Sequence, residues 1–414
     1  MLLLLGLPRS CLPGAQFSLA TKETIMTTTS TVPNLGSTQG ANPLKGLLAY
    51  GQSAWMDYIR RDLLTSGELQ RLIHDDGLRG MTSNPAIFEK AIATSQDYAD
   101  ILNSPEAKKL NATQIYEKIA IRDVQQATDI FKPVYLDSKR RDGYVSLEVS
   151  PDLAHDAAAT LAEARRLWKE VGRENVMIKV PATKECIPVI RQLLEDGINI
   201  NITLLFAQSA YEQVAEAYIS ALEARSQKGQ DLSHIASVAS FFVSRIDTLI
   251  DGIIDEKLAA EKDDSKRALL SGIHGKIAIA NAKLTYKKYQ ELFSGPRWQA
   301  LASKGAQTQR LLWASTSTKN PKYRDVIYVE ELIGADTVDT IPPATFDAFR
   351  DHGKLRNSLT EDVPGAAQIM ANLEKAGISM KEATDKLLED GVKIFHDSFA
   401  KLLVATGKSA GVHA

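Results

Sequence analysis

Short apolar runs rich in strand-forming residues alternate along this chain with longer stretches that have helical periodicity. The clearest apolar runs lie at 144–149, 175–180, 198–206, 234–246 and 310–315. Helical patterns at 153–172 and 206–225 separate some of these runs. Strands that alternate with helices favour a parallel sheet with crossover helices. An α/β fold of this kind is either a closed barrel or an open, doubly wound sheet.

Three weaker runs and the placing of polar side chains favour the barrel. Runs at 53–59, 78–85 and 336–343 bring the candidate strands to eight. Successive residues of a strand face opposite sides, and three of the strands have one apolar side. Their other side carries Ser146, Glu148, Met177, Lys179, Asn199, Asn201 and Thr203. Since central strands of an open parallel sheet are apolar on both faces, this pattern predicts a (β/α)8 TIM barrel with an inward polar site.

Composition argues against several classes of function. The 414 residues include 49 Lys and Arg against 51 Asp and Glu, and a net charge of −2 argues against a general nucleic-acid binder. No run of about 18 apolar residues is present, which argues against a membrane-spanning helix. The two cysteines, Cys11 and Cys186, fit a reducing cytoplasm. Histidine spacing suited to a metal and a glycine-rich phosphate fingerprint are both missing, so we expect neither metal nor cofactor.

The chain divides into a tail, a barrel and a second tail. Residues 1–41 are expected to form a disordered N-terminal tail, and Met26 is an alternative start of the chain. Residues 42–404 are expected to form the barrel, and residues 405–414 a flexible C-terminal tail.

Lys179 is the most informative single residue. It lies in an apolar strand, where a charged and unpaired lysine is energetically costly. One interpretation is a structural ion pair with a carboxylate such as Glu148. The other is a lysine of lowered pKa whose neutral amine attacks a carbonyl group and forms a Schiff base. That chemistry needs groups that move protons, and Glu148, Asp57 and Thr203 are the inward candidates.

Five motifs in order resemble those of the transaldolases, in the class I Schiff-base aldolase superfamily. Segment 175–206, with NVMIKVPAT and GININITLLF, resembles the Schiff-base region of that family. The other motifs are MTSNPAIFEKAI (81–92), YVSLEVSPDLAHD (144–156), SVASFFVSRIDTLID (237–251) and RLLWASTSTKNP (310–321). The long segment between the second and third strands and the Trp-Ala-Ser-Thr sequence resemble the actinobacterial or cyanobacterial branch. The resemblance implies a barrel with a helical segment inserted between these strands.

The resemblance also implies roles for individual residues. Lys179 would form the Schiff base, and Glu148 and Thr203 would hold the water that relays protons. Asp57 would accept the proton of the donor's C4 hydroxyl group. The implied substrate-binding residues are Thr82, Asn84, Asn201, Ser240, Arg245, Ser315 and Lys319. Of these, Arg245 and Ser315 would hold a phosphate group.

Structural alternatives remain for several of these residues. Asn84 precedes a proline and suits the start of a turn, and Arg245 suits an ion pair with Asp247. Thr203 and Ser240 suit ordinary packing within strands. Asp57 has Arg60 and Arg61 at helical spacing, which suits a surface ion pair.

One departure from the family pattern concerns phosphate. Better-known transaldolases have an arginine two residues after the serine of the seventh strand, whereas here Ser315 is followed by Thr316, Ser317, Thr318 and Lys319. Either Lys319 supplies the cation, or Ser317 and backbone amides contribute more. Lysine binds phosphate as a point charge, without the two-pronged geometry of arginine.

The function that the resemblance implies is transfer of a dihydroxyacetone unit between phosphorylated sugars in the pentose phosphate pathway. We expect a cytoplasmic enzyme that is a monomer or homodimer. Two alternatives stay open. One is a Schiff-base aldolase of the fructose-6-phosphate type, which releases free dihydroxyacetone. The other is a catalytically inactive barrel that acts as a binding module.

Overall fold

Eight parallel strands form a closed barrel in chain order, β1-β2-β3-β4-β5-β6-β7-β8. The computed structural model describes residues 42–412, so the expected N-terminal tail lies outside the described residues. The strands are β1 (Gln52–Asp57), β2 (Gly80–Thr82), β3 (Tyr144–Glu148), β4 (Val176–Pro181), β5 (Ile200–Leu205), β6 (Ser237–Phe242), β7 (Arg310–Ala314) and β8 (Thr337–Ile341). The prediction of a (β/α)8 barrel is confirmed, and each strand overlaps one of the eight predicted runs.

Helices surround the barrel and connect its strands. The α-helices are α1 (Pro43–Gly46), α2 (Arg61–Thr65), α3 (Glu68–Asp75), α4 (Pro85–Thr94), α5 (Ala99–Leu102), α6 (Ala112–Asp137), α7 (Ala157–Val171), α8 (Cys186–Glu195), α9 (Gln208–Gln227), α10 (Ser244–Ala260), α11 (Asp264–Ile273), α12 (Ile277–Leu292), α13 (Pro296–Ala302), α14 (Ile327–Glu330), α15 (Pro343–His352), α16 (Val363–Lys375) and α17 (Met380–Ala410). Short 3-10 helices are η1 (Leu47–Tyr50), η2 (Ala107–Lys109), η3 (Pro151–Leu153) and η4 (Ser358–Thr360). The connection from β2 to β3 contains α4, α5, η2 and α6. Within residues 42–412, no helix combines the length and apolar character needed to cross a membrane.

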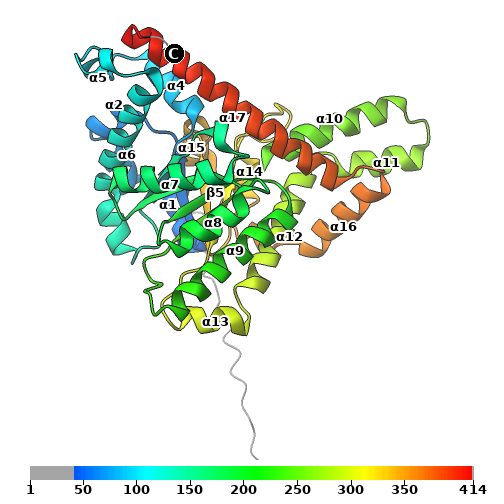
Figure 1. Cartoon of the computed structure of the whole chain (residues 1–414). Helices are drawn as coiled ribbons and strands as arrows, with labels where there is room; N and C mark the ends of the chain where they lie inside the picture. Colours follow the sequence, from blue (N-terminus) through cyan, green and yellow to red (C-terminus); the bar gives the residue numbers. More distant parts are fainter. Residues whose placement is uncertain (1–41, 413–414) are drawn as a thin grey trace, which may run out of the picture. The chain divides into compact units, whose positions relative to one another are not determined.

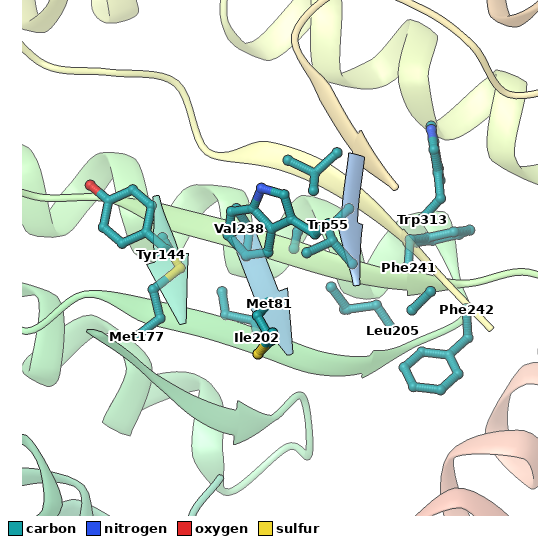
Figure 2. Close-up of a cluster of buried hydrophobic side chains, with 14 of the residues drawn as sticks. Trp55, Met81, Tyr144, Met177, Ile202, Leu205, Val238, Phe241, Phe242 and Trp313 are labelled. Carbon is teal, nitrogen blue, oxygen red and sulfur yellow. The ribbon is translucent and has the colours of Figure 1, made fainter. Parts of the chain in front are cut away.

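Large side chains fill the interior of the barrel on the amino-terminal side of the polar residues at the strand ends. Trp55 of β1 and Tyr144 of β3 are fully or almost fully buried, with ring centroids 6.4 Å apart (Figure 2). Gly80 of β2 makes room for this arrangement, because a Cβ atom there would lie 2.5 Å from the Trp55 ring. Met177 of β4 is buried in the same cluster. Inward residues nearer the carboxyl ends of the strands are therefore supported from below by a packed layer.

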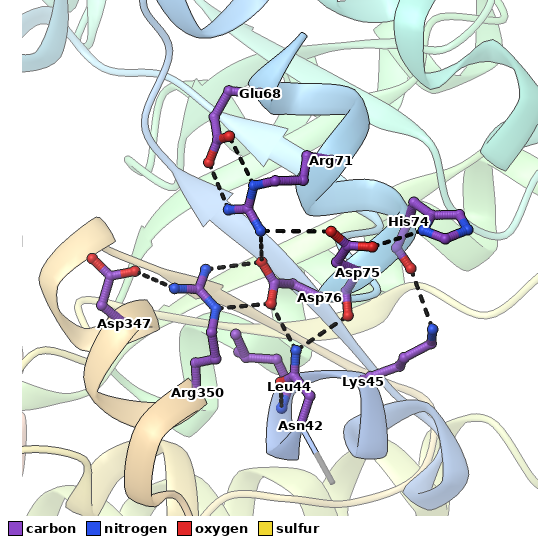
Figure 3. Close-up of polar contacts among 10 residues, drawn as sticks. All are labelled: Asn42, Leu44, Lys45, Glu68, Arg71, His74, Asp75, Asp76, Asp347 and Arg350. Atoms are coloured by element: carbon purple, nitrogen blue, oxygen red, sulfur yellow. Dashed lines mark hydrogen bonds and ion pairs between the residues drawn. The ribbon is translucent and has the colours of Figure 1, made fainter. Parts of the chain in front are cut away.

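A polar cluster joins the first and last βα units of the barrel (Figure 3). Asp76, at the end of α3, accepts a hydrogen bond from Asn42 at 2.7 Å and two from Arg350 of α15 at 2.8 and 2.9 Å. Its side chain is only 2% exposed. Arg71 of α3 also lies 3.6 Å from this carboxylate. Loss of Arg350 would remove its two shortest charged contacts and is therefore destabilising.

Helix α17 lies across the carboxyl ends of the strands and contacts α4, α6 and α10 (Figure 1). It extends to Ala410, so residues 405–410, expected to belong to a flexible tail, are helical. Thr406 and Gly407 are buried, and Gly411 ends the helix with a φ of 67°. The sequence-based boundary at residue 404 therefore lies inside this helix.

Candidate active site

Lys179 lies near the end of β4, inside the barrel, and is 5% exposed. It pairs in register with Glu148 of β3 on one side and Asn201 of β5 on the other. Its Nζ atom lies 3.4 Å from Oε2 of Glu148 and donates to the carbonyl oxygen of Ser83 at 3.2 Å. The ring of Phe395, from α17, lies 5.5 Å from Nζ. The ion pair expected in one interpretation is thus present, and it also sets an acid beside the amine.

The pKa of Glu148 lies in a range that suits proton transfer. Burial raises the pKa of its carboxyl group from 4.5 to about 7, although the positive charge of Lys179 acts in the opposite direction. A group with a pKa near neutrality both donates and accepts protons readily at physiological pH. The amine and a carboxyl group able to exchange protons are therefore adjacent.

Asp57 lies at the carboxyl end of β1, beside strands β2 and β8. Its Oδ1 atom accepts a hydrogen bond from Thr82 at 2.9 Å, and the Thr82 hydroxyl lies 2.7 Å from that of Thr340. Burial raises the pKa of Asp57, whereas Lys179 and hydrogen bonds with Thr82 and Asn84 lower it. A raised pKa makes this carboxylate a better base than an exposed aspartate.

Asp57 does not form the surface ion pair with Arg60 or Arg61 that its spacing suggested. Arg60 instead binds Asp97 at 2.9 Å, and Arg61 binds Asp123 at 2.7 Å. Asp57 is therefore left facing the interior of the barrel mouth.

Thr203, Asn201 and Ser240 lie on neighbouring strands β5 and β6. Asn201 donates to the Ser146 hydroxyl at 3.0 Å and accepts from the Ser240 hydroxyl at 2.6 Å. The buried Oγ1 atom of Thr203 has no hydrogen-bond partner among residues 42–412. A buried hydroxyl group without a partner is costly, so this atom suits a bound water or substrate group.

Asn84 has a structural role at the start of a helix, and it also lines the pocket. It caps α4, and its Oδ1 atom accepts from the backbone N–H of Ile87 at 3.1 Å. Pro85 at the first helical position suits this helix start. The motif around Asn84 therefore both ends β2 and fixes the direction of this side chain.

A pocket of about 190 Å³ is lined by most of these residues. Of the residues predicted from the sequence, it is lined by Asp57, Thr82, Asn84, Lys179, Thr203, Ser240, Arg245, Ser315 and Lys319. Glu148 and Asn201 do not line the pocket, but each contacts a residue that does. Glu148 accepts a hydrogen bond from Lys179, and Asn201 accepts one from Ser240.

The two cations of the pocket, Arg245 and Lys319, come from different elements. Arg245 lies in the first turn of α10, while Ser315, Ser317 and Lys319 lie in the loop after β7. Burial lowers the pKa of the Arg245 guanidinium, and no carboxylate of the described chain offsets this. Burial also lowers the pKa of Lys319, and the charge of Arg245 lowers it further. Like charges held together in this way favour an anion between or beside them.

The ion pair between Arg245 and Asp247 is absent from the described structure. Asp247 accepts instead from the backbone N–H of Ala278 at 2.7 Å and from the Tyr328 hydroxyl at 2.9 Å. Ser315 has a φ of 57°, an uncommon conformation for a residue other than glycine. Its hydroxyl lies 3.0 Å from that of Ser244, at the start of α10.

Some lining residues were missed by sequence reasoning. Thr340 of β8 and Phe242 of β6 line the pocket, and two-residue periodicity could have placed both inward. Phe395 also lines it but comes from a helix far along the chain, and nothing local in the sequence marks it. Within residues 42–412, no three His, Cys, Asp or Glu side chains form a potential metal site.

A buried amine beside a proton-exchanging carboxyl, at the carboxyl ends of barrel strands, defines an enzyme suited to Schiff-base chemistry on a carbonyl compound. A family model described as Transaldolase/Fructose-6-phosphate aldolase matches residues 54–406. The chain belongs to this family.

Its relatives include transaldolases from cyanobacteria and actinobacteria. The chain is 48% identical over 356 residues to "Transaldolase" of Trichodesmium erythraeum, covering 85% of this chain and 93% of the relative. It is 49% identical over 365 residues to "Transaldolase 2" of Nostoc sp., covering 87% and 96%. With "Transaldolase" of Frankia alni it shares 42% identity over 372 residues, covering 90% and 98%. The resemblance drawn from the five motifs is confirmed.

Proposed function

We propose that this enzyme transfers a dihydroxyacetone unit from sedoheptulose 7-phosphate to glyceraldehyde 3-phosphate, which yields erythrose 4-phosphate and fructose 6-phosphate. The observation that carries the proposal is the contact between Lys179 and Glu148, at 3.4 Å inside the barrel. A lysine paired with a carboxyl of pKa about 7 has the proton partner that Schiff-base formation requires. The reaction belongs to the non-oxidative pentose phosphate pathway.

In the proposed mechanism, the neutral amine of Lys179 attacks the ketone carbon of the donor sugar. The attack gives a carbinolamine on Lys179. Glu148, with a water held by Thr203, protonates its hydroxyl group, which leaves as water, and the iminium ion forms. Asp57 then takes the proton of the C4 hydroxyl group. The C3–C4 bond breaks, its electrons pass to the iminium nitrogen, and the aldehyde product departs.

The remaining steps reverse the first half with a new aldehyde. The enamine on Lys179 attacks the acceptor aldehyde, Asp57 returns its proton to the new hydroxyl group, and water releases the ketose product. Thr82, Asn84 and Ser240 are placed to hold hydroxyl groups of the bound unit. Asn201 supports Ser240 and thereby fixes that side of the pocket.

Asp57→Ala is expected to separate adduct formation from bond cleavage. Borohydride should still trap fructose 6-phosphate on Lys179, because the amine and Glu148 are unchanged. Release of glyceraldehyde 3-phosphate should slow by about 10²–10⁴-fold, the usual effect of losing a general base. Asp62→Ala, which removes a half-exposed carboxylate nearby, is the matched control. Loss of trapping in Asp57→Ala would assign Asp57 to an earlier step.

Arg245→Ala is expected to weaken binding of phosphorylated sugars. The KM should rise roughly ten- to a hundredfold with a much smaller change in kcat, because a charge-assisted hydrogen bond shared by ground and transition states is lost. Lys319→Ala should act in the same direction, since both cations line one pocket. Lys322→Ala, an exposed lysine of the same loop, serves as the control. An unchanged KM in Arg245→Ala would leave that residue a structural one.

The activity itself is tested by supplying fructose 6-phosphate with and without erythrose 4-phosphate. A transaldolase forms sedoheptulose 7-phosphate only when the acceptor is present. The family description also includes fructose-6-phosphate aldolase, and such an enzyme would release free dihydroxyacetone without an acceptor. Absence of both products and of a borohydride adduct would support the inactive barrel instead.

Three further expectations concern the partners, the location and the oligomeric state. Phosphorylated sugars are its small-molecule partners, and Arg245 and Lys319 are the groups that suit their phosphate. The cytoplasmic location and the monomeric or homodimeric state remain predictions from the sequence.

A further inference from the structure

The loop after β7 carries three residues that line the pocket, Ser315, Ser317 and Lys319. It runs from residue 315 to residue 326, between β7 and α14. Within the loop, the Lys319 ammonium donates to the Ser317 hydroxyl at 2.6 Å, but this bond links two residues of the same loop. The charge of Arg245 meanwhile acts against that of Lys319. Within the pocket, the negative charge of Asp57 attracts Lys319. Outside it, the loop is attached by Thr316 to Asp339 at 3.0 Å and by Arg324 to Glu330 at 2.8 and 3.0 Å. A further attachment binds the loop to the helix that carries Arg245.

Tyr323 provides such an attachment. Its hydroxyl donates to Oδ2 of Asp251 at 2.7 Å and lies 2.9 Å from Nδ1 of His274. The carboxylate of Asp251 is fixed in turn, because its Oδ1 atom accepts from the backbone N–H of Gly275 at 2.8 Å. Gly275 has a φ of 70°, and a Cβ atom there would lie 2.6 Å from the Tyr323 hydroxyl oxygen. The close approach of the tyrosine thus depends on glycine at this position.

The partner of Tyr323 lies on the same helix as the other cation. Asp251 and Arg245 both belong to α10, six positions apart, and α10 also holds Asp247, which accepts from Tyr328 of α14 at 2.9 Å. The two ends of the loop are therefore bound to one rigid element: Ser315 to Ser244 at its start, and Tyr323 to Asp251 near its end. Lys319 lies between these two attachments.

We infer that Tyr323, held by Asp251 and His274, is a positioning residue that keeps Lys319 beside Arg245 in a single phosphate-binding site. This inference rests on the proposed function, because it explains how a chain without the usual arginine after Ser315 holds a sugar phosphate. Lysine offers a point charge rather than a fork, so its position must come from the backbone that carries it. Tyr323 supplies that position without touching the substrate.

The test compares Tyr323→Phe, Lys319→Ala and the double variant by titration calorimetry with inorganic phosphate, which needs no turnover. Tyr323→Phe should raise the dissociation constant about three- to tenfold, as expected for one lost hydrogen bond that orients the cation. The double variant should bind phosphate no more weakly than Lys319→Ala, because Tyr323 acts through Lys319. Tyr218→Phe, which removes a buried hydroxyl near the amino ends of the strands, should have no effect.

Kinetics provide the second measurement. Tyr323→Phe should raise the KM for fructose 6-phosphate by a similar factor with kcat nearly unchanged, and should leave turnover of unphosphorylated fructose as in the parent enzyme. Unchanged phosphate affinity in Tyr323→Phe, or an effect that adds in full to that of Lys319→Ala, would overturn the inference. The expected phosphate affinities in an enzyme that does not turn over sugar phosphates would refute the proposed function alone.

Discussion

Lys179→Arg is expected to abolish both borohydride trapping and sugar transfer. Arginine keeps the positive charge beside Glu148 and a similar bulk. Its guanidinium group stays protonated, so it does not form a Schiff base with the sugar. The covalent route is then closed, and the rate should fall on the order of 10⁶-fold or more, the lower end of total enzymatic acceleration. Mass mapping of the trapped peptide in the parent enzyme identifies the modified lysine.

The control for Lys179→Arg is a measurement that the variant is still folded. Circular dichroism and thermal unfolding should show that Lys179→Arg remains folded, because the buried carboxylate keeps a cation beside it. Two other lysines test the assignment: Lys184, which follows β4, and Lys319. An adduct mapped to either of them would move the nucleophile to another part of the barrel and refute the proposed mechanism.

Glu148→Gln is expected to have the second-largest effect. Glutamine keeps the shape of the side chain but cannot move a proton, so steady-state transfer should slow by about 10²–10⁴-fold. Trapping should slow as well, since Schiff-base formation needs the same proton transfers, yet the adduct should still form on Lys179 with longer incubation. A defect identical to that of Asp57→Ala in both assays would mean that the two carboxylates do not have separate roles.

The pH dependence of stability gives an independent check on Glu148. Its pKa in the folded protein is about 7 against an ordinary value of 4.5. A raised folded-state pKa contributes stability that is fully present below pH 4.5 and is lost as pH rises through 7. The free energy of unfolding, measured in urea from pH 4.5 to 8, should therefore fall less steeply in Glu148→Gln. Equal slopes in the two proteins would contradict the raised pKa.

The barrel was predictable because the alternation of inward and outward side chains along each strand is visible in the sequence as an alternation of polar and apolar residues. Inward positions near the strand ends need not be apolar, so Glu148, Lys179 and Asn201 stand out against apolar outward neighbours. The register then brings these three onto adjacent strands. Strand ends were predicted less well: the expected run at 78–85 is a strand only over Gly80–Thr82, because Asn84 and Pro85 begin α4.

Other features depend on contacts between distant segments. The hydroxyl of Tyr323 meets Asp251 across 72 positions of sequence, and no periodicity indicates such a pair. Residues 405–410 include a glycine, which disfavours a helix by about 1 kcal/mol relative to alanine. Burial of Thr406 and Gly407 overrides that preference. Packing of this kind is decided by the whole fold and not by the local sequence.

Helix α17 gives the active site a particular place in the order of protein synthesis. Phe395 lies 5.5 Å from the Lys179 amine but is added by the ribosome after all eight strands. A nascent barrel thus passes through a stage in which its strands have been made while its lysine still lacks this aromatic cover. The pocket wall that Phe395 forms is therefore made only with α17, the last helix of the described residues.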